Sequence, residues 1–369
     1  MDVRAVSSDT VRGTPSSLGL EFYKLDSGGY YFDNAAFRLV WPELKLVWND
    51  WFIEFQGNPS SQHKRGKELK SKWNLELGML AEALSVAEEQ IIQVSSSTEA
   101  INQFLKSFLF QDSTRKKFVL PENEHKATTA VVNWLEQFGF RSVFVPLSAS
   151  GIIDEELLLD AIDEETCCVI VSHVNSETGH LLDISKIGQV CEAFGSKFFV
   201  DATQAVGKHP ISYWDHGVDA FCFSSQKIGA GSGSGYLVLR KPHSIQPLIH
   251  GGGQQDGLRS GSLNLLGLMS TRVALGFICN SIPITSEEIN VFLGEKVGMQ
   301  NVMFNLLTDS RVSLSPWIHL IALREESVNL THGSFLLSSG AACQSGTTRI
   351  PKAYQSMGNA SKVVFRLSL

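Results

Sequence analysis

Phe198-Phe-Val-Asp-Ala-Thr-Gln204 and Phe223-Ser-Ser-Gln-Lys227 are the two most informative segments of the sequence. In the first, an apolar run typical of a buried strand ends at a single acid, Asp201. In the second, a strand-like run that begins at Asp219 ends just before a single amine, Lys227. Polar residues at the carboxyl ends of buried strands lie at the mouth of the site in an α/β sheet. The two stretches therefore predict that an acid and an amine face one site.

An acid and an amine in such a site suit a pyridine aldehyde cofactor. The lysine can form a Schiff base with the aldehyde, and the acid can keep the ring nitrogen protonated so that the ring accepts electrons. A simpler interpretation makes Asp201 a turn residue at a strand end and Lys227 a solvated cation. These two residues alone favour the simpler interpretation, and the rest of the chain reverses that preference.

Strand and helix patterns alternate along most of the chain. Strand-like runs lie at 91–94, 117–120, 142–146, 167–174 and 198–201, and helical patterns at 64–87, 100–110, 126–138 and 155–162, with another helix capped by Asp183. This alternation predicts an α/β fold with a mostly parallel sheet and helices on both faces. The glycine-rich run 229–235 leads into a strand, so it is a turn between strands and not a dinucleotide fingerprint, which must open a helix.

Length and pattern suggest three parts. Residues 1–29 are predicted to be an N-terminal arm, 30–280 a large domain, and 281–369 a smaller α+β domain with one helix and short strands.

Composition excludes several classes of protein. With 43% hydrophobic and 19% charged residues the chain is globular, and its net charge of −7 argues against a nucleic-acid partner. No apolar run reaches the ~18 residues of a membrane span, and the first residues lack a signal peptide, so we expect a cytoplasmic protein that does not contact membranes. The six cysteines include no CxxC pair, so no metal site is predicted.

The turn Ser95-Ser-Ser-Thr-Glu99 joins a short strand to a helix. Backbone N–H groups, the helix dipole and the hydroxyls of Ser97 and Thr98 would converge there on an anion such as phosphate. An ordinary helix cap formed by a serine or threonine is the alternative that this stretch alone leaves open.

A series of motifs in one order carries a family resemblance. They are DNAA (33–36), GNPSSQH (57–63), SSSTEA (95–100), ENEHK (122–126), HVNSETG (173–179), VDATQAVGK (200–208), FSSQKIG (223–229), GGGQQDGLRSGS (251–262) and SSGAACQSG (338–346). Together they resemble PLP-dependent cysteine desulfurases, which are fold-type I PLP enzymes of the aminotransferase class V group. The cysteine segment resembles the group I branch, which is NifS- and IscS-like. The resemblance covers roughly residues 30 to 369.

The resemblance implies pyridoxal 5′-phosphate (PLP) as cofactor and a role for each matching residue. Lys227 would form the Schiff base and move protons, Asp201 would pair with the ring nitrogen, and His125 would stack on the ring and act as acid or base. Gln204 and Asn175 would hold the phenolic oxygen side of the cofactor. The phosphate would be held by Ser97, Thr98, Ser224 and Gln226, and by Ser262 from the partner subunit of a homodimer.

The resemblance also implies the substrate and the reaction. Arg366 matches the arginine that binds the carboxylate of L-cysteine, with Asn175 nearby, and Cys343 matches the cysteine that receives the sulfur. The expected activity converts L-cysteine to L-alanine and passes the persulfide sulfur from Cys343 to an acceptor protein, which the sequence does not name. Because only a few per cent of an ordinary thiol is ionised near pH 7, we expect His125 or the Lys227 amine to take the thiol proton.

Three departures keep other functions open. Gln226 stands where the family usually has histidine, Ser96 stands where glycine is common, and the chain ends at Leu369, where relatives usually continue into a further helix. A related PLP lyase or aminotransferase, such as one acting on selenocysteine, is one alternative. A scaffold that binds PLP or a partner protein without turnover is the other.

Overall fold

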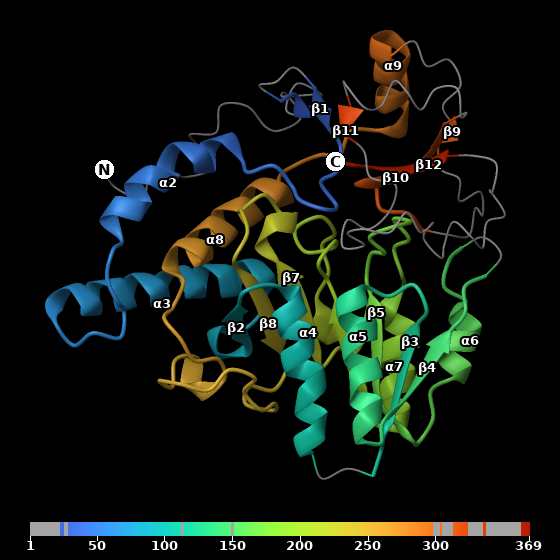
Figure 1. Cartoon of the computed structure of the whole chain (residues 1–369), viewed down its shortest axis with the longest axis horizontal. Coiled ribbons are helices and arrows are strands. Elements are labelled where there is room, and N and C mark those ends of the chain that lie inside the picture. Colours follow the sequence, from blue (N-terminus) through green and yellow to red (C-terminus); the bar gives the residue numbers. More distant parts are fainter. Residues whose placement is uncertain are drawn as a thin grey trace.

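The computed structural model describes residues 23–25, 29–111, 114–148, 151–297, 303–304, 313–323, 335–336 and 363–369. A seven-stranded sheet lies at the centre, with strand order β2-β8-β7-β6-β5-β3-β4 (Figure 1). Its strands are β2 (Ile91–Val94), β3 (Lys117–Pro121), β4 (Arg141–Val145), β5 (Thr166–Ser172), β6 (Lys197–Asp201), β7 (Ala220–Ser224) and β8 (Gly235–Leu239). β8 runs antiparallel to both of its neighbours, and every other pair is parallel. The predicted mostly parallel sheet is confirmed.

Helices cover both faces of this sheet. The α-helices are α2 (Pro42–Glu54), α3 (Lys64–Leu84), α4 (Ser97–Lys106), α5 (Lys126–Leu135), α6 (Glu155–Asp160), α7 (Ile184–Phe194), α8 (Leu265–Cys279) and α9 (Ser286–Val297). Short 3-10 helices are η4 (Glu88–Gln90), η5 (Ser107–Phe110), η6 (Glu136–Phe138), η7 (Tyr213–His216), η8 (Ser225–Lys227) and η9 (Gln255–Gly257).

Two apolar cores lie on opposite faces of the sheet. Side chains alternate between the faces along each strand, so Phe198 packs into one core, with α3, α7 and α8, while Phe199 packs into the other, with α4 and α5. Both phenylalanines are fully buried. Burial on both faces explains why these strands are continuous apolar runs in the sequence.

Local sequence fixes where α7 begins and ends. The Asp183 side chain accepts a hydrogen bond from the Ser185 N–H (3.0 Å), which confirms the predicted cap. Gly195 then ends the helix in the left-handed conformation, which costs glycine little because it has no Cβ. The helix therefore delivers the chain directly to β6 and Asp201.

Helix α2 was missed by the sequence patterns. Leu44 and Trp51 on it are buried, but Leu46, Phe52 and Ile53 are exposed, so apolar residues surround the helix. A helix without one apolar stripe gives no clear 3.6-residue period. Pro42 and the acidic Glu43 in its first turn are local signs of its start.

Segments from the two ends of the chain lie side by side. β12 (Val363–Ser368), β10 (Ile318–Leu323) and β9 (Met303–Phe304) form an antiparallel sheet, while β1 (Tyr30–Tyr31) pairs in parallel with β11 (Phe335–Leu336). Ser368 at the end of β12 donates its N–H to the Phe32 carbonyl (2.8 Å) and accepts from the Ala35 N–H through its hydroxyl (2.7 Å). The DNAA segment is thus bonded to the last strand.

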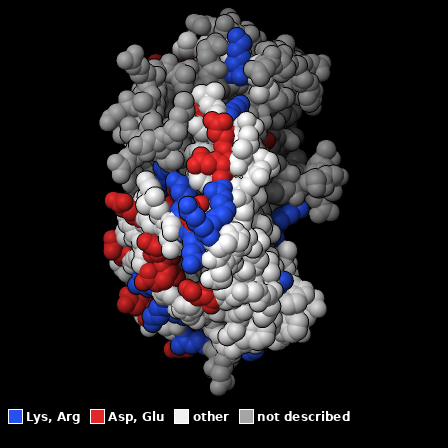
Figure 2. All heavy atoms as spheres, turned by 90° about the vertical axis from the view of Figure 1, so that its left-hand side faces the viewer, with Lys and Arg blue, Asp and Glu red and all other residues white. Residues whose placement is uncertain are grey.

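None of the described helices has the length and apolarity needed to cross a membrane. On the face seen in Figure 2, basic side chains gather beside acidic ones and do not form a separate basic surface.

Candidate active site

The polar ends of five sheet strands converge on one cavity of ≈ 120 Å³. Asp201 ends β6, Ser224 ends β7 and Ser172 ends β5, while α4 begins just after β2 and His125 precedes α5 just after β3. The lining includes the predicted residues His125, Asp201, Gln204, Ser97, Thr98, Ser224, Gln226, Lys227 and Arg366. Parallel strands bring their carboxyl ends to the same edge of a sheet, so residues from five separate motifs meet there.

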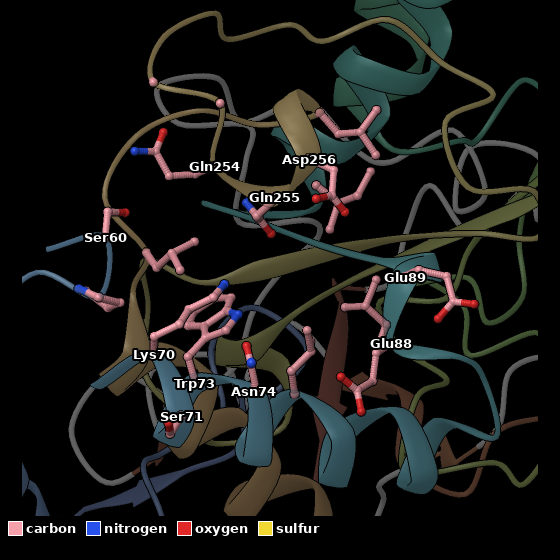
Figure 3. A pocket seen from close by; sticks show the side chains of 18 of the residues that line it. Ser60, Lys70, Ser71, Trp73, Asn74, Glu88, Glu89, Gln254, Gln255 and Asp256 are labelled. Carbon is pink, nitrogen blue, oxygen red and sulfur yellow. The ribbon is translucent and has the colours of Figure 1, made fainter. Parts of the chain in front are cut away.

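Two other clefts are larger, with ≈ 790 and ≈ 1230 Å³. Figure 3 shows the first of them, where Lys70, Trp73 and Asn74 of α3 face Gln254 and Gln255 across the opening. Neither contains a lysine and an acid at adjacent strand ends. We therefore identify the candidate site by its converging polar groups and not by its volume.

Asp201 and Lys227 reach the cavity from adjacent strands. β6 and β7 pair in parallel, and the chain turns through η8 directly after β7 to place Lys227. Asp201 is buried, and its Oδ1 accepts from the Thr203 N–H (3.0 Å). The Lys227 amine donates to the Ala35 carbonyl (2.8 Å) and to the Ala36 carbonyl. The acid and the amine thus belong to one site, as the opening stretches predicted.

Hydroxyl groups cluster at the start of α4. The Ser224 Oγ accepts from the Ser97 N–H (2.7 Å) and lies 2.8 Å from the Ser97 Oγ, which is 2.6 Å from the Thr203 Oγ1. Ser96, the N-cap residue, makes no side-chain capping bond. This arrangement favours the anion site over the ordinary cap, because the hydroxyls and the helix start face a common point.

His125 caps α5 with its ring. Its Nδ1 accepts from the Ala127 N–H at 3.1 Å. A neutral imidazole has one donor and one acceptor nitrogen, so a ring that accepts at Nδ1 carries its proton on Nε2. His125 in this tautomer is a proton donor at Nε2 and has no lone pair there.

Arg366 brings a buried guanidinium to the cavity. Its Nη2 is 2.6 Å from the Asp33 Oδ1, and its Nη1 donates to the Ser176 carbonyl at 2.8 Å. Burial raises the pKa of the Asp33 carboxyl above its usual value, and the opposing effects of Arg366 and Lys227 are smaller than that of burial. These two bonds use two of the five N–H donors of the guanidinium, and one of the remaining donors is the Nε, which is buried without a hydrogen-bond partner in the described structure.

Gln204 is held from two sides. Its Nε2 donates to the Ala35 carbonyl (2.8 Å), and its Oε1 accepts from the Lys208 amine (3.1 Å). Burial and the neighbouring cations Arg38, Lys227 and Arg366 lower the pKa of Lys208 far below its usual value. The side-chain amide that lines the cavity is therefore fixed in orientation.

Two predicted residues of the described part of the chain, Asn175 and Ser262, do not line this cavity. Asn175 uses its Oδ1 to accept from the N–H groups of Glu177 (2.9 Å) and Thr178 (3.0 Å), so its amide shapes the turn that follows β5. Such Asx turns use the same oxygen that a ligand would need. Ser262 is exposed on the loop after η9, outside the cavity of its own chain. Cys343 lies outside the described residues.

The sequence analysis missed three residues at the site. Ser172 and Thr203 line the cavity, and Asp33 holds Arg366. Ser172 is the last residue of β5, so the rule about polar residues at strand ends could have found it. No local pattern points to Asp33, because its partner lies at the other end of the chain.

The described residues contain no group of three or more His, Cys, Asp or Glu side chains that could hold a metal ion. The chemistry available at this site is that of an amine, two carboxylates, a guanidinium, an imidazole and hydroxyls.

A fold-type I architecture with a lysine and an acid at adjacent strand ends defines a class of enzymes. Similarity to known proteins identifies the family of this chain within that class. The family model for Aminotransferase class-V matches residues 30–288. The chain therefore belongs to the aminotransferase class-V family.

The relatives of this chain include several cysteine desulfurases. The chain is 30% identical to cysteine desulfurase IscS of Dictyoglomus turgidum, over 66% of this chain and 62% of that protein. It is 29% identical to cysteine desulfurase 2 of Trichormus variabilis, over 89% of this chain and 84% of that protein. A solved NifS-like protein superposes with a TM-score of 0.78 at 27% identity, covering 92% of this chain and 93% of that chain.

Proposed function

We propose that the protein is a PLP-dependent cysteine desulfurase that converts L-cysteine to L-alanine and leaves the sulfur as a persulfide on Cys343. The observation that carries the proposal is the single cavity that joins Lys227, Asp201 and Arg366. The cysteine desulfurases among the relatives support it.

The residues of the cavity fit PLP and an amino acid. Ser97, Ser224 and Thr203 supply hydroxyls at a helix start for a phosphate. Two cavity atoms, Gln226 Oε1 and Arg366 Nε, are buried without partners in the described structure. A buried polar atom without a partner costs about 1–3 kcal/mol, which a ligand with both donors and acceptors recovers.

Bound PLP supplies an aldehyde and a ring that accepts electrons from the substrate. Lys227 would hold the aldehyde, and Asp201 would keep the ring nitrogen protonated. The Thr203 N–H bond keeps the Asp201 carboxylate in one orientation for this task.

Arg366 would orient the substrate. A planar guanidinium binds a carboxylate through two donors and so fixes which substrate bond is aligned for reaction. The Ser176 carbonyl and Asp33 keep the guanidinium plane in place. Its 1% exposure excludes water, which strengthens the interaction with a carboxylate.

The tautomer of His125 helps to divide the proton transfers. Its Nε2 carries the proton while Nδ1 accepts from Ala127, so the neutral ring donates a proton and does not accept one at Nε2. The Lys227 amine, once the substrate has released it from the aldehyde, is the remaining nitrogen base among the described cavity residues. We therefore assign removal of the thiol proton to the Lys227 Nζ and proton donation to the His125 Nε2.

We further propose a homodimer in which Ser262 reaches the partner's phosphate site. Ser262 is exposed and lies outside the cavity of its own chain, which supports this arrangement.

A solved structure described as SspA in complex with cysteine has the same fold as this chain, with a TM-score of 0.80 at 23% identity.

The test uses purified protein with PLP, L-cysteine and a reductant, assayed for alanine, sulfide and protein-bound persulfide, with Cys343→Ala alongside. We expect alanine and sulfide in a one-to-one ratio from the wild type and a loss of persulfide in the variant. A yellow protein that binds PLP without releasing sulfur would favour the scaffold alternative. Faster release of selenium from selenocysteine, unaffected by Cys343→Ala, would favour the selenocysteine lyase.

A further inference from the structure

Glu124 is a buried carboxyl directly behind the cavity wall. It follows β3 and precedes His125, and only 6% of its surface is exposed. Its Oε1 accepts from the Ser172 N–H and its Oε2 accepts from the Ser172 Oγ, both at 2.6 Å. Ser172 itself lines the cavity. Ser172, a residue of the cavity wall, thus donates two hydrogen bonds to Glu124, a carboxyl that has no role in the proposed reaction.

This carboxyl has no strong cationic partner. In the described part of the chain no lysine or arginine pairs with it, and the titratable groups that act on it are Asp201 on β6 and His125 on its own segment. Burial raises the pKa of Glu124 to about 7, against the lowering effect of the Ser172 bonds, with Asp201 raising it further and His125 lowering it. The charge of Glu124 therefore changes in the neutral pH range.

The protonation state of Glu124 determines whether the Ser172 hydroxyl can donate a hydrogen bond to a ligand in the cavity. A hydroxyl has one proton to donate and two lone pairs. When Glu124 is ionised, that proton is donated to Oε2, so only lone pairs remain for the cavity. When Oε2 takes up a proton from solvent, the acid donates to the Ser172 Oγ, and the serine proton can turn toward the cavity. No other bond has to change.

We propose that Ser172 is a further ligand-contacting residue of this cavity and that Glu124 is its positioning residue, which sets whether the hydroxyl accepts from or donates to the ligand. The inference rests on the proposed function only in taking PLP as the ligand. Protonation of Glu124 removes a buried negative charge and adds a donor, and both changes favour a ligand with net negative charge.

Glu124→Gln tests the proposal because it copies the protonated state. The amide oxygen still accepts from the Ser172 N–H, and the amide nitrogen donates to the Ser172 Oγ at every pH. We expect PLP to bind wild type and variant equally at about pH 6, and the variant about tenfold more tightly at about pH 8. In a Ser172→Ala background this difference should shrink. A ratio of dissociation constants that does not change with pH would overturn the proposal.

A second measurement needs no cofactor. The infrared band of a protonated carboxyl in the protein without PLP should titrate near neutral pH, vanish in Glu124→Gln, and shift to higher pH in Ser172→Ala, where the carboxylate loses a donor. A band that Ser172→Ala leaves in place contradicts the coupling. If neither protein binds PLP, the proposed function fails, while the infrared titration still tests the Glu124–Ser172 pair.

Discussion

Asp33 and Arg366 are 333 residues apart in the chain, yet their Oδ1 and Nη2 atoms are 2.6 Å apart in an ion pair that leaves Arg366 1% exposed. The hydrogen bonds between Ser368 and residues 32–35 hold the two segments together around this pair. The arginine that we expect to bind substrate is therefore positioned by the beginning of the chain.

Removing Asp33 should destabilise the fold. Asp33→Ala leaves a buried guanidinium without its counter-charge, and breaking such a pair costs about 3–5 kcal/mol. Urea unfolding of Asp33→Ala, Arg366→Gln and the double variant measures this coupling. The double variant should be clearly more stable than the sum of the single losses predicts. Additive losses would show that the pair contributes no interaction energy.

His125→Asn should reduce the enzymatic activity while keeping the N-cap of α5. Asparagine is a good N-cap residue and can accept from the helix N–H, so the free energy of unfolding should change by less than about 1 kcal/mol. It has no proton to give at the Nε2 position, so alanine production should fall by about 10²–10⁴-fold. Thermal unfolding and the alanine assay are run on the same preparation. Near-normal activity would mean that another group donates the proton.

Thr203→Val should weaken cofactor binding. The change keeps the shape of the side chain but removes the hydroxyl that lies 2.6 Å from the Ser97 Oγ. We expect the dissociation constant for PLP to rise about tenfold. Thr129→Val, which removes an exposed hydroxyl from α5, is the matched control and should leave binding unchanged. An equal effect of both variants would exclude Thr203 from the phosphate site.

Stability should fall in mild acid because of buried histidines. Burial lowers the pKa of His173 and of His180 from 6.5 to about 4. Between these values the unfolded chain binds protons that the folded chain does not, so stability is full above about pH 6.5 and decreases as the pH falls toward 4, by at most about 3 kcal/mol per histidine.

His180→Gln should flatten this dependence, as measured by the unfolding temperature against pH. The Nδ1 of His180 has no hydrogen-bond partner in the described structure, so glutamine removes the titration without removing a hydrogen bond of that atom. His250→Gln changes an exposed histidine and serves as control. Parallel curves for His180→Gln and wild type would contradict this explanation.

The sheet and the lysine–acid pair could be predicted from local patterns in the sequence. Apolar runs buried on both faces, and single polar residues such as Asp201 and Ser224 at their ends, are local patterns, and parallel strands bring those ends together. The start of α4 and the cap at Asp183 were predictable for the same reason, since each depends on a few adjacent residues.

The contacts of the individual side chains could not be predicted from the sequence and became known from the folded structure. Asp33 forms an ion pair with Arg366, and Glu124 accepts hydrogen bonds from Ser172. Asn175 accepts hydrogen bonds within its own turn and does not line the cavity. A polar side chain can form only a few hydrogen bonds, and groups from distant segments compete for its donors and acceptors once the chain has folded. That competition depends on positions in space, which no spacing along the sequence records.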